Sequence, residues 1–149
     1  MKLLSFMLIT AILGWGSKIK VMESTSQEWV GGLQESGYGT NYKLNITVKA
    51  GSDKLQINDL WVGDIHMKTR VINPVNPSAR DFKKGTTITV RAEVTFRPGA
   101  DAKIRQLNAG DVRKPFNFKG QGLLGYTYKG KAYYLEIPDI KELEKIIYP

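Results

Sequence analysis

Hydrophobic and polar residues alternate along most of the chain after residue 17. The clearest run is Thr86–Phe96, and a period of two residues predicts a strand with one buried face. Lys83-Lys84-Gly85 predicts a turn before this strand, and Pro98 is expected to end it because proline cannot donate to a sheet ladder. Its inward positions are Ile88, Val90, Ala92, Val94 and Phe96.

A second alternating run covers Tyr42–Val48 and is followed by a four-residue loop and a further apolar pair, Leu55 and Ile57. The short loop predicts a hairpin between these two segments. In that hairpin Val48 lies opposite Leu55, and Ile46 lies opposite Ile57.

The period then breaks at the apolar triplet Leu60-Trp61-Val62, which predicts either a bulge or a second short strand that aims Trp61 differently from Ile57. A further strand is expected over Ile65–Ile72. It ends in residues 73–78, where two prolines and several turn formers predict a loop.

The strongest local pattern is a hairpin near the end of the chain. Lys129-Gly130 are the expected central turn residues between Leu123–Tyr128 and Ala132–Ile137. This turn places Tyr126 opposite Tyr133. A short helix is then predicted from Asp139, because Glu142 stands three residues after this acidic cap and three apolar residues share a helical face: Ile140, Leu143 and Ile147.

About seven strands separated by turn signals, without alternating strands and helices, favour an all-β fold. We expect a single antiparallel β-sandwich of immunoglobulin-like type, with the short C-terminal helix across one end. The alternative is an oligonucleotide-binding-type β-barrel. The expected core is Leu44, Ile46, Val48, Leu55, Ile57, Ile88, Val90, Val94, Phe96, Leu124, Tyr126 and Leu135.

The first residues predict export. Lys2 precedes an uncharged apolar run that ends at Gly14-Trp15-Gly16, and these are the parts of a secretory signal peptide. The run is shorter than the roughly 20 apolar residues of a membrane-spanning helix. We therefore expect a signal peptide at residues 1–16 and one domain at 17–149, with no transmembrane helix in the mature chain. A periplasmic or extracellular location follows.

Two glycine-rich stretches carry a resemblance to a group of proteins. They are Trp29–Tyr42, which contains Trp-x-Gly-Gly just before a strand, and Phe118–Gly130. They resemble small, uncharacterised exported bacterial β-sandwich proteins. The resemblance implies export and an all-β fold, and it implies no activity.

Composition removes much of the catalytic repertoire. The chain has 149 residues with no cysteine and a single histidine, His66. The missing cysteine excludes disulfides, thiolate zinc sites and cysteine nucleophiles. His66 could share a strand face with Asp64 and Lys68, and we interpret it as an ordinary surface histidine rather than a metal ligand. We predict no cofactor, no metal site and no catalytic residue.

Charge gives the strongest surface signal, because the formal net charge is +8 at pH 7. The segment from Arg97 to Lys119 holds six basic and two acidic residues. We predict that this long connection contacts an acidic partner, such as an envelope component, a glycan or a protein. Nucleic acid is disfavoured as the partner. The proposed contacts are Lys103, Arg105, Arg113 and Lys114.

Four aromatic residues have no assigned core face: Trp29, Trp61, Tyr38 and Tyr134. They could form a flat glycan-binding platform, although packing explains them better. The sequence as a whole favours a non-catalytic exported binding or interaction module of the bacterial cell envelope. The alternatives are a small extracytoplasmic hydrolase, for which no catalytic motif is present, and a glycan-binding domain.

Overall fold

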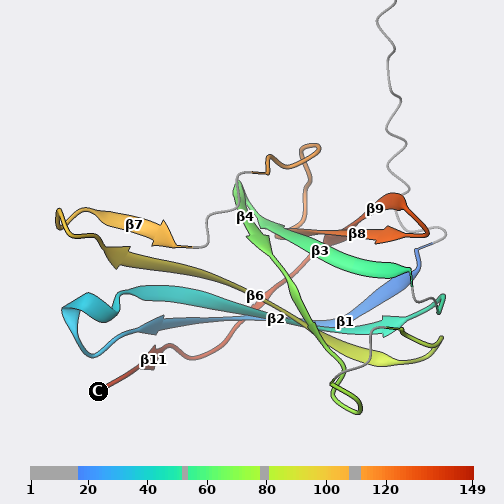
Figure 1. Cartoon of the computed structure of the whole chain (residues 1–149), viewed down its shortest axis with the longest axis horizontal. Coiled ribbons are helices and arrows are strands. Elements are labelled where there is room, and N and C mark those ends of the chain that lie inside the picture. Colours follow the sequence, from blue (N-terminus) through green and yellow to red (C-terminus); the bar gives the residue numbers. More distant parts are fainter. Residues whose placement is uncertain (1–16, 52–53, 78–80, 108–111) are drawn as a thin grey trace, which may run out of the picture.

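The computed structural model describes residues 17–51, 54–77, 81–107 and 112–149 (Figure 1), so the predicted signal peptide lies outside it. Within these ranges the only helix is a short 3-10 turn, η1 (Gln34–Ser36), and no helix could cross a bilayer. The all-β class is therefore confirmed. The strands are β1 (Ile19–Val30), β2 (Tyr38–Val48), β3 (Leu55–Val62), β4 (Ile65–Lys68), β5 (Arg70–Ile72), β6 (Thr87–Pro98), β7 (Ile104–Leu107), β8 (Gly122–Tyr128), β9 (Lys131–Ile137), β10 (Lys141–Glu142) and β11 (Ile146–Ile147).

The strands form two sheets that pack in layers (Figure 1). In the larger sheet the order is β10-β1-β2-β6-β5, with β11 also paired to β1 and β7 paired to β6. In the smaller sheet the order is β4-β3-β8-β9. The sheets stay separate, as in a sandwich, so the alternative prediction of a closed barrel is wrong.

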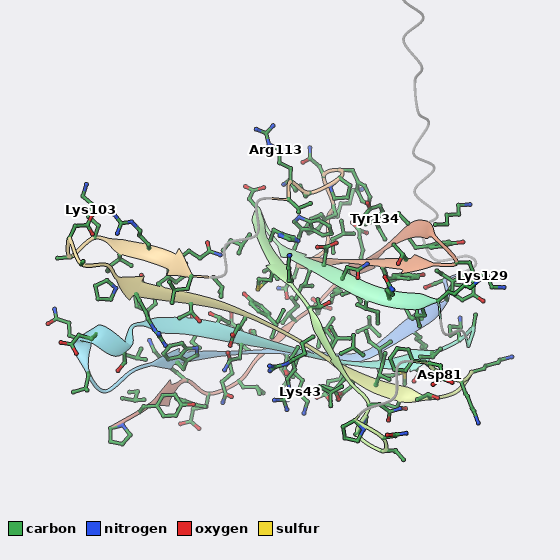
Figure 2. All side chains as sticks on the ribbon, viewed as in Figure 1. Lys43, Asp81, Lys103, Arg113, Lys129 and Tyr134 are labelled. Carbon is green, nitrogen blue, oxygen red and sulfur yellow. The ribbon has the colours of Figure 1, made fainter. Side chains whose placement is uncertain are left out.

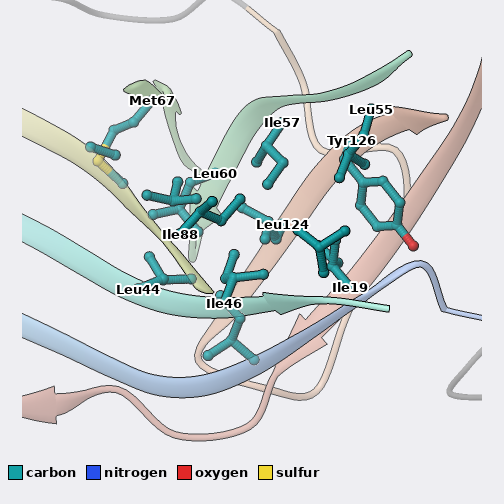
Figure 3. Packing of buried hydrophobic residues seen from close by; sticks show 14 of the residues in the cluster. Ile19, Leu44, Ile46, Leu55, Ile57, Leu60, Met67, Ile88, Leu124 and Tyr126 are labelled. Atoms are coloured by element: carbon teal, nitrogen blue, oxygen red, sulfur yellow. The ribbon is translucent and has the colours of Figure 1, made fainter. Parts of the chain in front are cut away.

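The core lies between the two sheets (Figure 3). One face of each strand supplies it, because successive side chains of a strand point to opposite sides. The residues predicted for the core are all buried except Phe96 and Leu135, which are half-buried at its margin. Burial of each large apolar side chain stabilises the fold by about 1.5–3 kcal/mol.

The alternation of the sequence does not predict β1. Its register against β2 shifts between Val21 and Glu23, so the inward positions change from odd to even numbers. After the shift the buried positions hold small polar residues, Ser24 and Ser26. A bulge followed by polar inward residues hides the period of two from a reading of the sequence.

The predicted hairpin between Tyr42–Val48 and Leu55–Ile57 is wrong. β2 pairs with β1 and β6, whereas β3 pairs with β4 and β8, so the two strands belong to different sheets. The apolar faces of two strands that meet across a core have the same alternation as those of a hairpin. The expected bulge is present in β3, where the register shifts between Ile57 and Asp59.

The expected strand over Ile65–Ile72 is divided between the two sheets. β4 pairs with β3, and β5 pairs with β6. Thr69 lies at the bend, where its amide donates to the carbonyl of Asn58 at 3.0 Å and its hydroxyl donates to the carbonyl of Ile57 at 2.8 Å. The bend brings Arg70 into the larger sheet, opposite Arg91.

The predicted helix from Asp139 is also wrong, because the tail forms β10 and β11 along the edge of β1. The amide of Leu143 donates to the carbonyl of Ser26 at 2.8 Å, and the amide of Tyr148 donates to that of Val30 at 3.0 Å. An isolated helix of this length is marginal in water. The exposed edge of β1 instead offers unpaired backbone groups that the tail satisfies.

The hairpin of β8 and β9 is confirmed. Lys129 and Gly130 have φ angles of 49° and 76°, the left-handed conformations that a two-residue hairpin turn requires. Tyr126 lies opposite Tyr133, and their stacked rings are 5.4 Å apart between centroids. The hydroxyl of Tyr126 also accepts a hydrogen bond from the amide of Lys18 at 3.1 Å, which connects the start of β1 to the smaller sheet.

A second cluster covers the outer face of the smaller sheet. Trp61 and Leu123 are opposite each other there, and both are buried. The indole nitrogen of Trp61 donates to the carbonyl of Val112 at 3.0 Å, and the Phe116 ring meets Tyr134 edge-on at 5.7 Å. These contacts hold the segment after residue 111 against the sheet.

Candidate functional site

A groove of about 390 Å³ crosses the outer face of the larger sheet. Residues of β1, β2 and β6 line it, with the β4–β5 bend at one end and Leu143 of the tail at the other. The neighbours Leu44 and Val90 are buried in the core, so alternation turns Lys43 and Arg91 outward. Figure 2 shows Lys43 pointing away from the smaller sheet.

Four basic residues form one row across this face, which we call the basic row: Lys141, Lys43, Arg91 and Arg70. Lys43 lies opposite Arg91, and Arg91 lies opposite Arg70. On the other side Lys43 lies opposite Thr25, which in turn pairs with Lys141. Residues paired in this way share a face at about 5 Å between Cβ atoms, so the row concentrates positive charge.

The groove is electrostatically unbalanced. Its lining holds four basic residues, Lys43, Lys68, Arg70 and Arg91, and one acidic residue, Glu93. In the described part of the chain, none of these four cations has a carboxylate oxygen within 4.0 Å. Like charges directly opposite on neighbouring strands destabilise a sheet. This arrangement keeps a surplus of positive charge although the repulsion lowers the stability of the sheet. Such a surplus is expected where a ligand of negative charge binds.

The predicted anion contacts Lys103 and Arg105 lie on the β6–β7 hairpin instead. The guanidinium of Arg105 donates to both carboxylate oxygens of Asp101, at 2.9 and 2.6 Å. These hydrogen bonds, with one from the amide of Lys103, hold the pKa of the Asp101 carboxyl below its usual value. Arg105 is thus engaged within its own hairpin, while Lys103 stays exposed.

The other two predicted contacts lie beside the smaller sheet. Lys114 forms an ion pair with Asp64 at 2.6 Å, and Arg113 is exposed beside a second hollow that both basic residues line. Figure 2 shows Lys103 and Arg113 in separate parts of the molecule. The four predicted residues therefore do not form one surface, and their role in binding stays a prediction.

His66 is buried rather than exposed at the surface, so this prediction is wrong. Its Nε2 atom lies 2.6 Å from Oδ1 of Asp59, while its Nδ1 atom is buried and has no hydrogen-bond partner in the described part of the chain. Its ring packs against Trp61 at 5.2 Å between centroids. Only 2% of the residue is exposed, so the imidazole is out of reach of a substrate. Within the described residues, no three acidic or histidine side chains gather as a metal site.

The four unassigned aromatic residues do not share one platform. Trp61 and Tyr134 are neighbours on the smaller sheet, with ring centroids 6.2 Å apart. Trp29 and Tyr38 lie on β1 and β2 of the larger sheet, where Tyr38 stacks on Phe96 at 5.2 Å. The burial of Trp61 supports the packing interpretation for that residue.

Sequence reasoning missed the basic row even though it assigned outward positions to two of its members. Alternation places Lys43 and Arg91 on the solvent side of their strands. It does not say that β2 and β6 are neighbours, or that Arg70 joins the same sheet after the bend at Thr69. Net charge along a single segment was therefore a poor guide to charge in space.

No family model, curated protein or solved structure matches this chain.

Proposed function

We propose that this protein is an exported, non-catalytic binding module that holds an acidic ligand in the groove of the larger sheet. The observation that carries the proposal is the basic row, in which Lys43, Arg91 and Arg70 occupy three adjacent strands and have no carboxylate partner among the described residues. A bound anion relieves the repulsion among these cations. Binding therefore gains free energy both from the new contacts and from removal of a destabilising term.

The strand order supports the immunoglobulin-like type of sandwich as part of this proposal. β1-β2-β6-β5 packed against β4-β3-β8-β9 follows the A-B-E-D and C′-C-F-G order of such domains. β7 and the two tail strands are additions to that order. The topology does not identify the ligand, because proteins with one fold can have many different functions.

Export is supported by the pattern of charge and hydrophobicity at residues 2–17. We expect a mature chain that starts near Ser17, and intact-mass measurement of protein from its native envelope checks this. A full-length species in the cytoplasm argues against export and leaves the groove proposal to be judged on its own.

Binding to an immobilised polyanion tests the groove. The double variant Lys43→Thr/Arg91→Thr places a β-branched residue on each strand, so it preserves strand propensity while removing two charges. On a heparin column it should elute at clearly lower salt than the parent. Its thermal stability should be equal or slightly higher, since two like-charge contacts are lost.

A matched control is Lys83→Ser/Lys84→Ser. It removes the same charge from an exposed turn that precedes β6, and about 13 Å of extended strand separates Thr87, the first residue of β6, from Arg91. The control should elute close to the parent. Equal shifts for both double variants mean that only net charge matters, and the assignment to the groove then fails.

A further inference from the structure

We infer that the ligand of the groove is a linear acidic polysaccharide that lies across the strands of the larger sheet. This inference rests on the proposed function and names the ligand class of the same site. Its basis is the arrangement of two parallel rows of side chains on the outer face, one basic and one largely neutral.

The basic row extends in one direction across the sheet, and its cations do not surround a single point. Lys43, Arg91 and Arg70 stand on adjacent strands about 5 Å apart, and Lys141 continues the line two strands beyond Lys43. From β5 to β10 the row spans about 19 Å. A small anion reaches only two of these cations at once. A chain with a negative charge on each unit can contact all of them.

A second row runs beside the first and is displaced from it by two residues on each of β1, β2 and β6. Gln27 lies opposite Asn41, and Asn41 lies opposite Glu93. All three line the groove. The side-chain nitrogen of Gln27 donates to the Glu144 carbonyl at 2.9 Å, so its side-chain oxygen remains as an acceptor. The Asn41 amide can donate and accept, and the Glu93 carboxylate accepts from hydroxyl groups. The groove thus matches a ligand that carries acidic groups along one edge and hydroxyl groups along the other.

These features favour an acidic sugar polymer over other polyanions. A polyphosphate has no hydroxyl groups for the second row and carries charge on both edges, so one charged edge lies beside Glu93. A sugar polymer with its acidic groups toward the basic row places hydroxyl groups there instead. A single-stranded nucleic acid is held by stacking on aromatic rings. Tyr42 is the one aromatic residue in the lining, and its paired neighbours Ser26 and Ala92 are buried, which places its ring on the opposite face.

Titration calorimetry of the full chain with galacturonic acid and its oligomers tests the inference. Affinity should rise several-fold from the disaccharide to the tetrasaccharide, because one further ion contact forms. The gain should level off once the oligomer exceeds the length of the row. Arg70→Thr should weaken binding of the tetrasaccharide several-fold, and it should weaken binding of the disaccharide less.

The comparison with sodium polyphosphate of similar charge separates the ligand classes. The parent should bind polyphosphate more weakly than it binds the tetrasaccharide. Glu93→Gln removes the negative charge from the second row, so the difference between the two affinities should become smaller. Equal affinity for monosaccharide and tetrasaccharide overturns the polymer inference while anion binding stands. Tighter binding of polyphosphate or of an oligonucleotide overturns the polysaccharide class in the same way. If no anion binds, the proposed function itself fails.

Discussion

Val90→Asp should strongly destabilise the protein. The Val90 side chain is fully buried between Leu44 of β2 and Val71 of β5. Loss of its apolar burial costs about 1.5–3 kcal/mol, and a carboxyl group without a hydrogen-bond partner costs about 1–3 kcal/mol more. A total near 4 kcal/mol is a large part of the 5–15 kcal/mol that stabilises a typical domain. The Tm should fall by about 10 °C or more.

Thr89→Asp is the matched control. Thr89 lies on the outer face, half-buried, and its hydroxyl donates to Oδ1 of Asn45 at 3.3 Å. Loss of this hydrogen bond should cost no more than about 1 kcal/mol. Urea denaturation followed by circular dichroism measures both variants, with the m-value as a check on two-state behaviour. Equal losses for the two variants refute the assignment of strand faces, and with it the outward direction of the basic row.

Three further changes test the contacts around the smaller sheet and the half-buried Tyr42. Trp61→Phe removes the indole donor to the Val112 carbonyl, so stability should fall by about 1 kcal/mol and amides of the following segment should exchange faster with solvent. Asp59→Ala leaves both ring nitrogens of His66 without a partner, and urea denaturation should report a loss of about 1–3 kcal/mol; a loss near zero contradicts the structural role of the pair. Burial raises the pKa of the Tyr42 phenol above its ordinary value of 10.0. The folded state therefore holds this proton more tightly than the unfolded chain, and stability should fall as pH rises from about 10 toward the folded pKa. Tyr42→Phe should lose less stability than the parent between about pH 9 and pH 11. If the free energy of unfolding changes with pH equally in both proteins, Tyr42 does not contribute to the loss.

Alternation predicted individual strands well where the inner face is purely apolar. β6 and the β8–β9 hairpin were predicted because their periods are unbroken and their turns have the required residues. β1 was missed because a bulge and the buried Ser24 and Ser26 disguise its period. The tail was misassigned because Ile140, Leu143 and Ile147 fit a helical face, while the open edge of β1 that recruits the tail is not visible in the sequence.

The candidate site depends on which strands become neighbours, and local patterns do not contain that information. Lys43 and Arg91 are separated by 48 positions, and only the pairing of β2 with β6 places them side by side. By contrast, the cations of the Arg97–Lys119 segment are close in sequence but divided between a hairpin and a loop. Alternation likewise gives no sign that His66 is buried, because its contacts with Asp59 and Trp61 depend on the pairing of β3 with β4.

Amide chemical-shift mapping tests the central claim most directly. The ¹⁵N-labelled chain is titrated with a short heparin oligosaccharide at constant salt and pH. The largest shifts should fall on residues 41–43, 91–93 and 70, which line the groove on three strands. Shifts confined to residues 103–105 and 113–114 contradict the account, since the acidic ligand then contacts the exposed hairpin and loop instead of the sheet.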